Sequence, residues 1–180
     1  SQVKKPRYHR TMQGASIYSM IENNIIEGDN RFISGNVLTG SKISKNGYLG
    51  FYHNEISVIP EGKEQDFLGW LLPGLNKYSL SRTFFSWLNP KKKYSISSNM
   101  NGEERAYVVT GQYENVLPMD LHPQHLIKAI MIGDIELMEN LGIYEVAEED
   151  FALCEFACTS KIPVQEILRD GLDLVRKECS

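Results

Sequence analysis

The sequence is poor in cysteine and lacks any long hydrophobic run, and both absences narrow the class of protein. Its three cysteines, Cys154, Cys158 and Cys179, all lie near the end of the 180-residue chain. So few, in an odd number, do not make the disulfide framework of a small secreted domain, which favours a reducing compartment. The most apolar segment, residues 67–72, is far shorter than the roughly 18 to 20 residues that cross a bilayer. We therefore expect a soluble or peripheral protein.

An excess of positive charge is also missing, since the formal net charge is -4. This argues against nucleic-acid binding as the main task. Lys91, Lys92 and Lys93, flanked by Trp87 and Tyr94, resemble the basic patch with aromatics of single-stranded nucleic-acid binders. Three lysines after a turn are more typical of a solvated surface, so we expect no nucleic-acid partner.

What the chain does contain is typical of a globular protein, with 42% hydrophobic and 23% charged residues. It begins without Met and without a basic segment leading into an apolar one, which we interpret as a cut inside a longer protein. In the first sixty residues, β-branched and aromatic runs bounded by Gly, Asn and Pro predict strands at 8–11, 31–34 and 55–59. Ile17, Met20 and Ile21 have helical spacing, which predicts a helix over 15–24.

These signals divide the chain into three parts and indicate an α+β fold. Residues 1–62 are expected to form a small β-grasp-like (SLBB-like) unit, because a sheet with one apolar face needs a helix to cover it. Residues 63–120 read as a connector with little regular structure. Residues 121–180 are expected to form a C-terminal helical bundle, with helices at 123–132, 135–141, 148–157 and 163–177; Pro123 and Pro163 suit a first helical turn.

Cys154 and Cys158 are the sharpest chemical feature, because four residues on a helix place both thiols on one face. They are the candidate metal or redox ligands, but a zinc or iron-sulfur site needs two more soft ligands that Cys179 alone does not supply. With Phe151, Leu153 and Phe156 around them, we interpret both as buried core cysteines.

Other candidate sites are weaker. Asp120, His122 and His125 offer a carboxylate and two imidazoles, yet this composition also suits a helix start before Pro123, which we prefer. Gly35 and Gly40 bracket a stretch without the Lys-Ser/Thr pair of a P-loop. No nucleophile elbow, zinc-protease motif or Cys-His pair appears, and we expect no catalytic, cofactor or metal site in this chain.

Long stretches nevertheless resemble one known family, the A subunits of the bacterial Na+-translocating NADH:quinone reductases. The similarity covers nearly the whole chain. The matching strings are NRFISGNVL at 30–38, GYLGFYHNEISV at 47–58, FLGWL at 67–71, PGLNKYS at 73–79, RTF at 82–84, NGEERA at 101–106, GQYE at 111–114, VLPMD at 116–120 and EEDFALC at 148–154.

This resemblance implies the C-terminal portion of a peripheral subunit on the cytoplasmic side of the inner membrane. The complex passes electrons from NADH to ubiquinone and exports Na+, and NADH, flavins, iron-sulfur centres and quinone are expected elsewhere in it. The family is similar in architecture to the NADH-oxidising subunit of respiratory complex I, whose bundle binds an iron-sulfur cluster. Here Cys154 to Thr159 looks like only the tail of that motif, since Thr159 stands where a proline usually follows, which suggests a lost cluster.

The function that this resemblance implies is a structural or docking part of the complex, with the other subunits as partners. Trp70, Phe84 and Trp87 are the candidate interface residues, although large aromatics often pack in a core instead. The alternative function is a metal or redox protein that uses Cys154 and Cys158.

Overall fold

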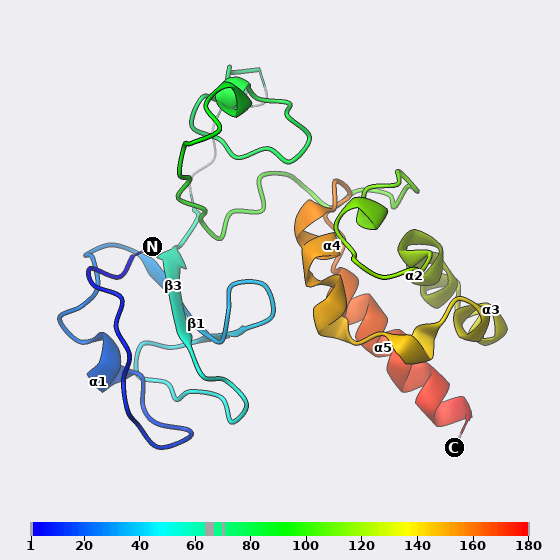
Figure 1. The fold of residues 1–180 in the computed structure, drawn as a ribbon, viewed down its shortest axis with the longest axis horizontal. Helices are drawn as coiled ribbons and strands as arrows, with labels where there is room; N and C mark the ends of the chain where they lie inside the picture. Colours follow the sequence, from blue (N-terminus) through cyan, green and yellow to red (C-terminus); the bar gives the residue numbers. More distant parts are fainter. Residues whose placement is uncertain (1, 64–66, 70, 180) are drawn as a thin grey trace. The chain divides into compact units, whose positions relative to one another are not determined.

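The computed structural model describes residues 2–63, 67–69 and 71–179, and it divides the chain into two compact units, Ser1–Met100 and Asn101–Ser180. The first unit contains a small sheet and the second is helical (Figure 1). The α+β class predicted from the sequence is thus confirmed. Within the described ranges, no helix is both long and apolar enough to cross a bilayer.

The first unit is built on a three-stranded antiparallel sheet in the order β2-β1-β3. The strands are β1 (Asn30–Ser34), β2 (Ser41–Ile43) and β3 (Ile56–Pro60), with Phe32 opposite both Ile43 and Val58. Ile33 and Val58 are buried with Ile17, Met20 and Ile21 from the segment around helix α1 (Tyr18–Ile21). A helix therefore supplies apolar cover in this unit, as expected of a small sheet.

Two predictions for this unit are wrong and one strand was missed. Residues 8–11 are exposed and pair with no strand, so the strand predicted there does not form. The predicted helix over 15–24 shrinks to the four residues of α1. Asn23 has a positive φ of 61°, which stops the helix, and Ser16 instead bridges to Tyr48. Strand β2 has no apolar run to signal it; its pairing with β1 defines it.

The segment between the sheet and the helical unit has little regular structure in its described residues. Among its described residues it contains only two short 3-10 helices, η1 (Phe85–Leu88) and η2 (Tyr113–Asn115). By its contacts, the segment up to Met100 belongs to the first unit and the segment from Asn101 to the second. Buried Gln124 fastens the latter, since its Oε1 accepts bonds from the backbone N–H groups of Thr110 (2.8 Å) and Gly111 (2.9 Å).

The second unit packs its helices around one apolar core. They are α2 (Pro123–Ile132), α3 (Ile135–Asn140), η3 (Ile143–Glu145), η4 (Glu148–Phe151), α4 (Ala152–Ala157) and α5 (Val164–Glu178). The core includes Leu126, Met138, Phe151 and Leu168, all fully buried. The helix predicted over 148–157 is divided into η4 and α4, while the other helix bounds agree with the sequence to within one residue.

Local chemistry explains the helix ends in this unit. Gly133 ends α2 in a left-handed conformation, φ 72°, that suits glycine. Asp134 then caps α3 by accepting a bond from the Leu137 N–H at 3.0 Å. Gly171 lets α5 approach α2 closely, because a Cβ there would lie 2.8 Å from Cγ1 of Ile130. Arg176 and Lys177 lie in the last turn of α5, where the helix dipole favours cations.

Candidate functional site

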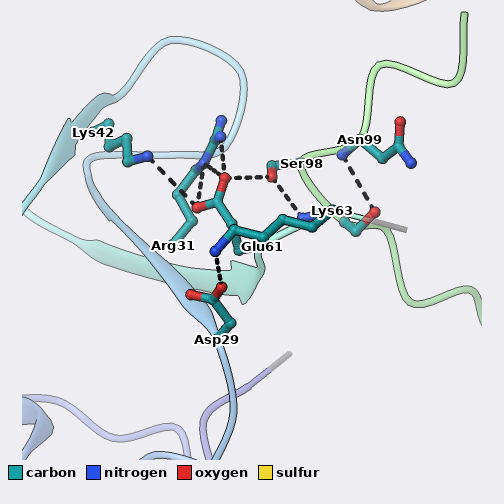
Figure 2. Close-up of polar contacts among 9 residues, drawn as sticks. Asp29, Arg31, Lys42, Glu61, Lys63, Ser98 and Asn99 are labelled. Carbon is teal, nitrogen blue, oxygen red and sulfur yellow. Dashed lines mark hydrogen bonds and ion pairs between the residues drawn. The ribbon is translucent and has the colours of Figure 1, made fainter. Parts of the chain in front are cut away.

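A polar network at the end of β3 holds the start of the connector. Glu61 directly follows β3, and its carboxylate accepts three bonds from Nε and Nη2 of Arg31 in β1, with Nε 3.0 Å from Oε2 (Figure 2). Lys42 of β2 adds its ammonium at 3.6 Å. The pKa of Glu61 falls to about 2, chiefly because Arg31 donates to the carboxylate, with Ser98 and Lys42 contributing in the same direction. Glu61 is therefore ionised across the physiological range.

The same network also holds the chain at Ser98, within the connector. Ser98 Oγ donates to Glu61 at 3.1 Å and accepts the N–H of Gly62 at 2.9 Å (Figure 2). The Ser98 N–H donates to the Pro60 carbonyl at 3.1 Å. Gly62 and Ser98, 36 positions apart in the chain, are thus fixed at one point. The chain between them forms a long loop whose two ends lie together, and we call residues 67–97 the connector lobe.

A hollow of about 360 Å³ lies beside this network, lined by side chains of both signs that include Lys42, Lys45 and Lys63. Two of its cations are already paired within it, Arg31 with Glu61 and Lys63 with Asp29. These ion pairs explain the charged side chains of the hollow as contacts that stabilise the sheet. The hollow therefore reads as part of the polar network.

The connector lobe exposes most of its large apolar side chains. In η1, buried Ser86 faces inward, and its Oγ donates to the Lys77 carbonyl at 2.6 Å. Tyr94 OH donates to the Ser86 carbonyl at 3.1 Å. Because Ser86 is held from within, its neighbours point outward. The exposed large residues of the lobe are Phe67, Leu68, Leu71, Leu72, Leu75, Tyr78, Leu80, Phe85, Trp87, Leu88 and Ile96.

The candidate interface residues have different environments. Trp87 is 48% exposed and so is available to a partner. Phe84 is half-buried: its ring covers Gly74, where an added Cβ would collide with the ring, and the Lys77 ammonium lies 5.6 Å from the ring centre. Phe84 therefore supports the lobe from inside. Trp70 lies outside the described residues.

Cys154 and Cys158 both lie in the core of the second unit. Cys154 is in α4 and Cys158 directly follows it. Burial, aided by the charge of Glu114, raises the pKa of the Cys154 thiol to about 12. A thiol with such a pKa is protonated at neutral pH and is a poor nucleophile or metal ligand. Cys179 is exposed, with Sγ 3.7 Å from Tyr144 OH.

The Asp120, His122 and His125 cluster has the character of a helix start. His122 is the residue that precedes α2, Pro123 occupies its first position, and the two imidazole rings lie 6.1 Å apart on the surface. Across the described ranges, no three His, Cys, Asp or Glu side chains are grouped as a metal would require. The alternative of a metal protein thus gains no support.

One pair was missed from the sequence. Ser34, 1% exposed, has Oγ 2.7 Å from Nδ1 of His53 and accepts the Gly50 N–H at 2.8 Å. The 19 positions that separate the pair give no spacing signal. A buried serine is not accessible to substrates. We therefore interpret the pair as a contact that holds the segment 35–55 against the end of β1.

Comparison with known proteins agrees with the resemblance. The model of the family described as NQRA C-terminal domain matches residues 1–45. Curated A subunits of Na(+)-translocating NADH-quinone reductases match 98% of the chain, at 43% identity in Vibrio anguillarum and 44% in both Hahella chejuensis and Pasteurella multocida. The chain spans about 40% of the length of each of these relatives. The resemblance predicted from the sequence is thus confirmed: along almost its whole length, the chain is related to the A subunits of the Na+-translocating NADH-quinone reductases.

Proposed function

We propose that this chain is the C-terminal, docking part of a peripheral subunit in a complex that transfers electrons from NADH to ubiquinone and exports Na+. The support is the 43% identity to a reductase A subunit over 98% of the chain. In this proposal the chain lies on the cytoplasmic side of the membrane. NADH, flavin, iron-sulfur centres and quinone bind elsewhere in the complex, and the other subunits are the partners.

The observation that carries the docking role is the connector lobe. A lobe fixed at both ends by the Glu61 network exposes eleven large apolar side chains among its described residues, as a surface that binds a partner does. The rest of the first unit, to which the lobe belongs, serves as its support. The second unit acts as a helical bundle whose buried cysteines fill its core, so the chain contributes no catalytic group of its own.

Membrane vesicles that hold the complex without its A subunit test this function. The tagged 180-residue chain is sedimented with these vesicles and with vesicles from cells that make none of the complex. We expect more chain on the first kind, and crosslinks to the neighbouring subunits. Equal retention on both kinds would contradict docking to the complex.

Two variants test whether the connector lobe makes the contact. Replacing Trp87 and Leu88 together by Ala removes two exposed apolar groups and is expected to lower retention by about ten-fold or more, since each buries apolar area on binding. The matched control is Ile132→Ala at the end of α2, which is also exposed, at 72%. Unchanged retention of the double variant would mean that the docking surface lies outside the lobe.

A further inference from the structure

We infer that the connector lobe binds the surface of an anionic lipid bilayer, with its apolar tips in the headgroup region and its lysines against the anionic headgroups. This rests on the proposed function, which places the chain beside a membrane. It goes further by naming what the lobe touches there, which is lipid.

The first observation is the outward face of η1. In a 3-10 helix, side chains three residues apart lie one above the other, so Phe85 and Leu88 share one side. Trp87 stands next to them, and Phe85, Leu88 and Trp87 are 56%, 65% and 48% exposed. Ser86 and Tyr94 hold the opposite side of the turn inside the lobe. The result is a compact apolar tip on a supported turn.

The second observation is charge. Residues 67–97 contain Lys77, Arg82, Lys91, Lys92 and Lys93 and no Asp or Glu, a net charge of +5. The whole chain carries -4, so the rest of it carries -9. The residues just before the lobe, 63–66, change its charge by only one unit. The lobe, which exposes large apolar side chains, is thus positively charged, whereas the rest of the chain is negatively charged.

The third observation is the position of the lysines. Lys92 Nζ donates to the Leu75 carbonyl at 2.6 Å, which ties the basic turn to another exposed apolar segment. Lys91 and Lys93, on either side of it, are exposed. The basic turn follows η1 after only two residues. Flexible lysines beside an inserted apolar tip reach the headgroup level, as such side chains do at membrane interfaces.

Composition favours lipid over an acidic protein surface as the occupant. Lysine is depleted in protein interfaces, and leucine is under-represented among their energetically important residues. The exposed set of the lobe is instead rich in Leu, with Phe, Trp and Lys. That combination is typical of segments that lie in a membrane interface, where anionic lipid attracts each nearby lysine.

Protein-free vesicles test the inference with the full 180-residue chain. We expect co-sedimentation with vesicles of phosphatidylcholine mixed with phosphatidylglycerol, much weaker binding to phosphatidylcholine alone, and loss of binding as salt rises. Replacing Lys91 and Lys93 by Gln is expected to lower the partition coefficient about thirty-fold, from roughly 1 kcal/mol for each lysine. Trp87→Ala with Leu88→Ala is expected to lower it about ten-fold.

Matched controls separate the local effect from net charge. Lys45→Gln with Lys128→Gln removes the same charge from exposed positions outside the lobe and is expected to leave binding within about two-fold. Circular dichroism of every variant checks that it folds. No binding to anionic vesicles at low salt, or equal binding to both kinds of vesicle, would overturn the inference.

The two proposals fail separately. Binding to vesicles that hold the complex, without binding to protein-free anionic vesicles, would retain the docking function and assign the lobe to a protein partner. Binding to protein-free anionic vesicles with no gain from the complex would retain the lipid contact and remove the docking function.

Discussion

The second unit and the connector lobe are both rich in large apolar residues but use them in opposite ways. In the second unit, Phe151, Leu126, Met138 and Leu168 are fully buried around one core. Among the described residues of the lobe, eleven such side chains are exposed. The difference follows from local structure: helical periodicity gathers apolar residues on faces that pack together, whereas the Pro and Gly turns of the lobe do not. Burial stabilises the first region, and exposure equips the second for binding.

The largest expected effect comes from truncating equivalent rings in the two regions. Phe151→Ala leaves a cavity in a closed core and is expected to lower the free energy of unfolding by about 3 to 5 kcal/mol. Phe85→Ala removes a ring that is 56% exposed and is expected to change it by at most about 0.5 kcal/mol. Urea unfolding followed by far-UV circular dichroism measures the first, because most helices lie in the second unit. Equal losses of unfolding free energy in the two variants would contradict the difference in burial between the two regions.

A smaller loss is expected where α5 meets α2. Gly171→Ala would normally stabilise a helix by up to about 1 kcal/mol, but here the new Cβ meets three carbons of Ile130 at 2.8 to 2.9 Å. Overpacking of about 1 to 3 kcal/mol should win, since both residues lie in a close-packed interior. Urea unfolding of this variant measures the loss.

A double-mutant cycle with Ile130→Ala tests this explanation of Gly171. This substitution removes Cγ1, Cγ2 and Cδ1, the three carbons that the new Cβ would meet, so the paired variant should lose less stability than the two single losses together. Strict additivity would show that Ile130 is not the obstacle.

Sequence reasoning succeeded in the second unit and succeeded less in the first for the same reason. The 3.6-residue period and Pro123 at a helix start are local signals, and the helix predicted over 123–132 coincides with α2. Strand β2 and the short α1 depend on partners far along the chain, such as the pairing of Ile33 with Lys42 and of Ser16 with Tyr48. Such partners leave no spacing signal.

The candidate site residues show the same difference between local signals and partners far along the chain. The exposure of Trp87 follows from a Pro-bounded, irregular segment, and its role at an interface stays a prediction. The inward placement of Phe84 over Gly74 could not be predicted from the sequence, because it depends on how the lobe folds back on itself. The Glu61 network was missed for the same reason, since Arg31 and Ser98 lie 30 and 37 residues from Glu61.

Acid is expected to loosen the lobe while leaving the helical core folded. The pKa of Glu61 is lowered from 4.5 to about 2 by its bonds, so its contribution is fully present above pH 4.5 and is lost as pH falls from there through about 2. Tryptophan fluorescence, whose two sources Trp70 and Trp87 both belong to residues 67–97, should therefore change in this window before the circular dichroism does. Glu61→Gln should remove much of that pH dependence at the cost of a looser lobe at neutral pH.

Glu148→Gln is the matched control for Glu61, because Glu148 also pairs with an arginine, Arg169, but in the second unit. This variant should leave the acid response of the tryptophan fluorescence unchanged. A response to acid that survives Glu61→Gln would assign it to another carboxylate.

The smallest effect on the fold, and the sharpest test of burial in the second unit, is expected from its thiols. Cys154 is fully buried with its pKa raised to about 12, and Cys158 is 2% exposed, so neither sulfur is accessible to a reagent in the native state. Cys179 is exposed at the end of α5. A thiol-reactive dye should therefore label one cysteine quickly and the other two only at the rate at which the core opens. Cys179→Ala should abolish the fast phase without changing stability, whereas fast labelling that persists in this variant would mean that the cysteine pair is accessible and would revive a redox role for it.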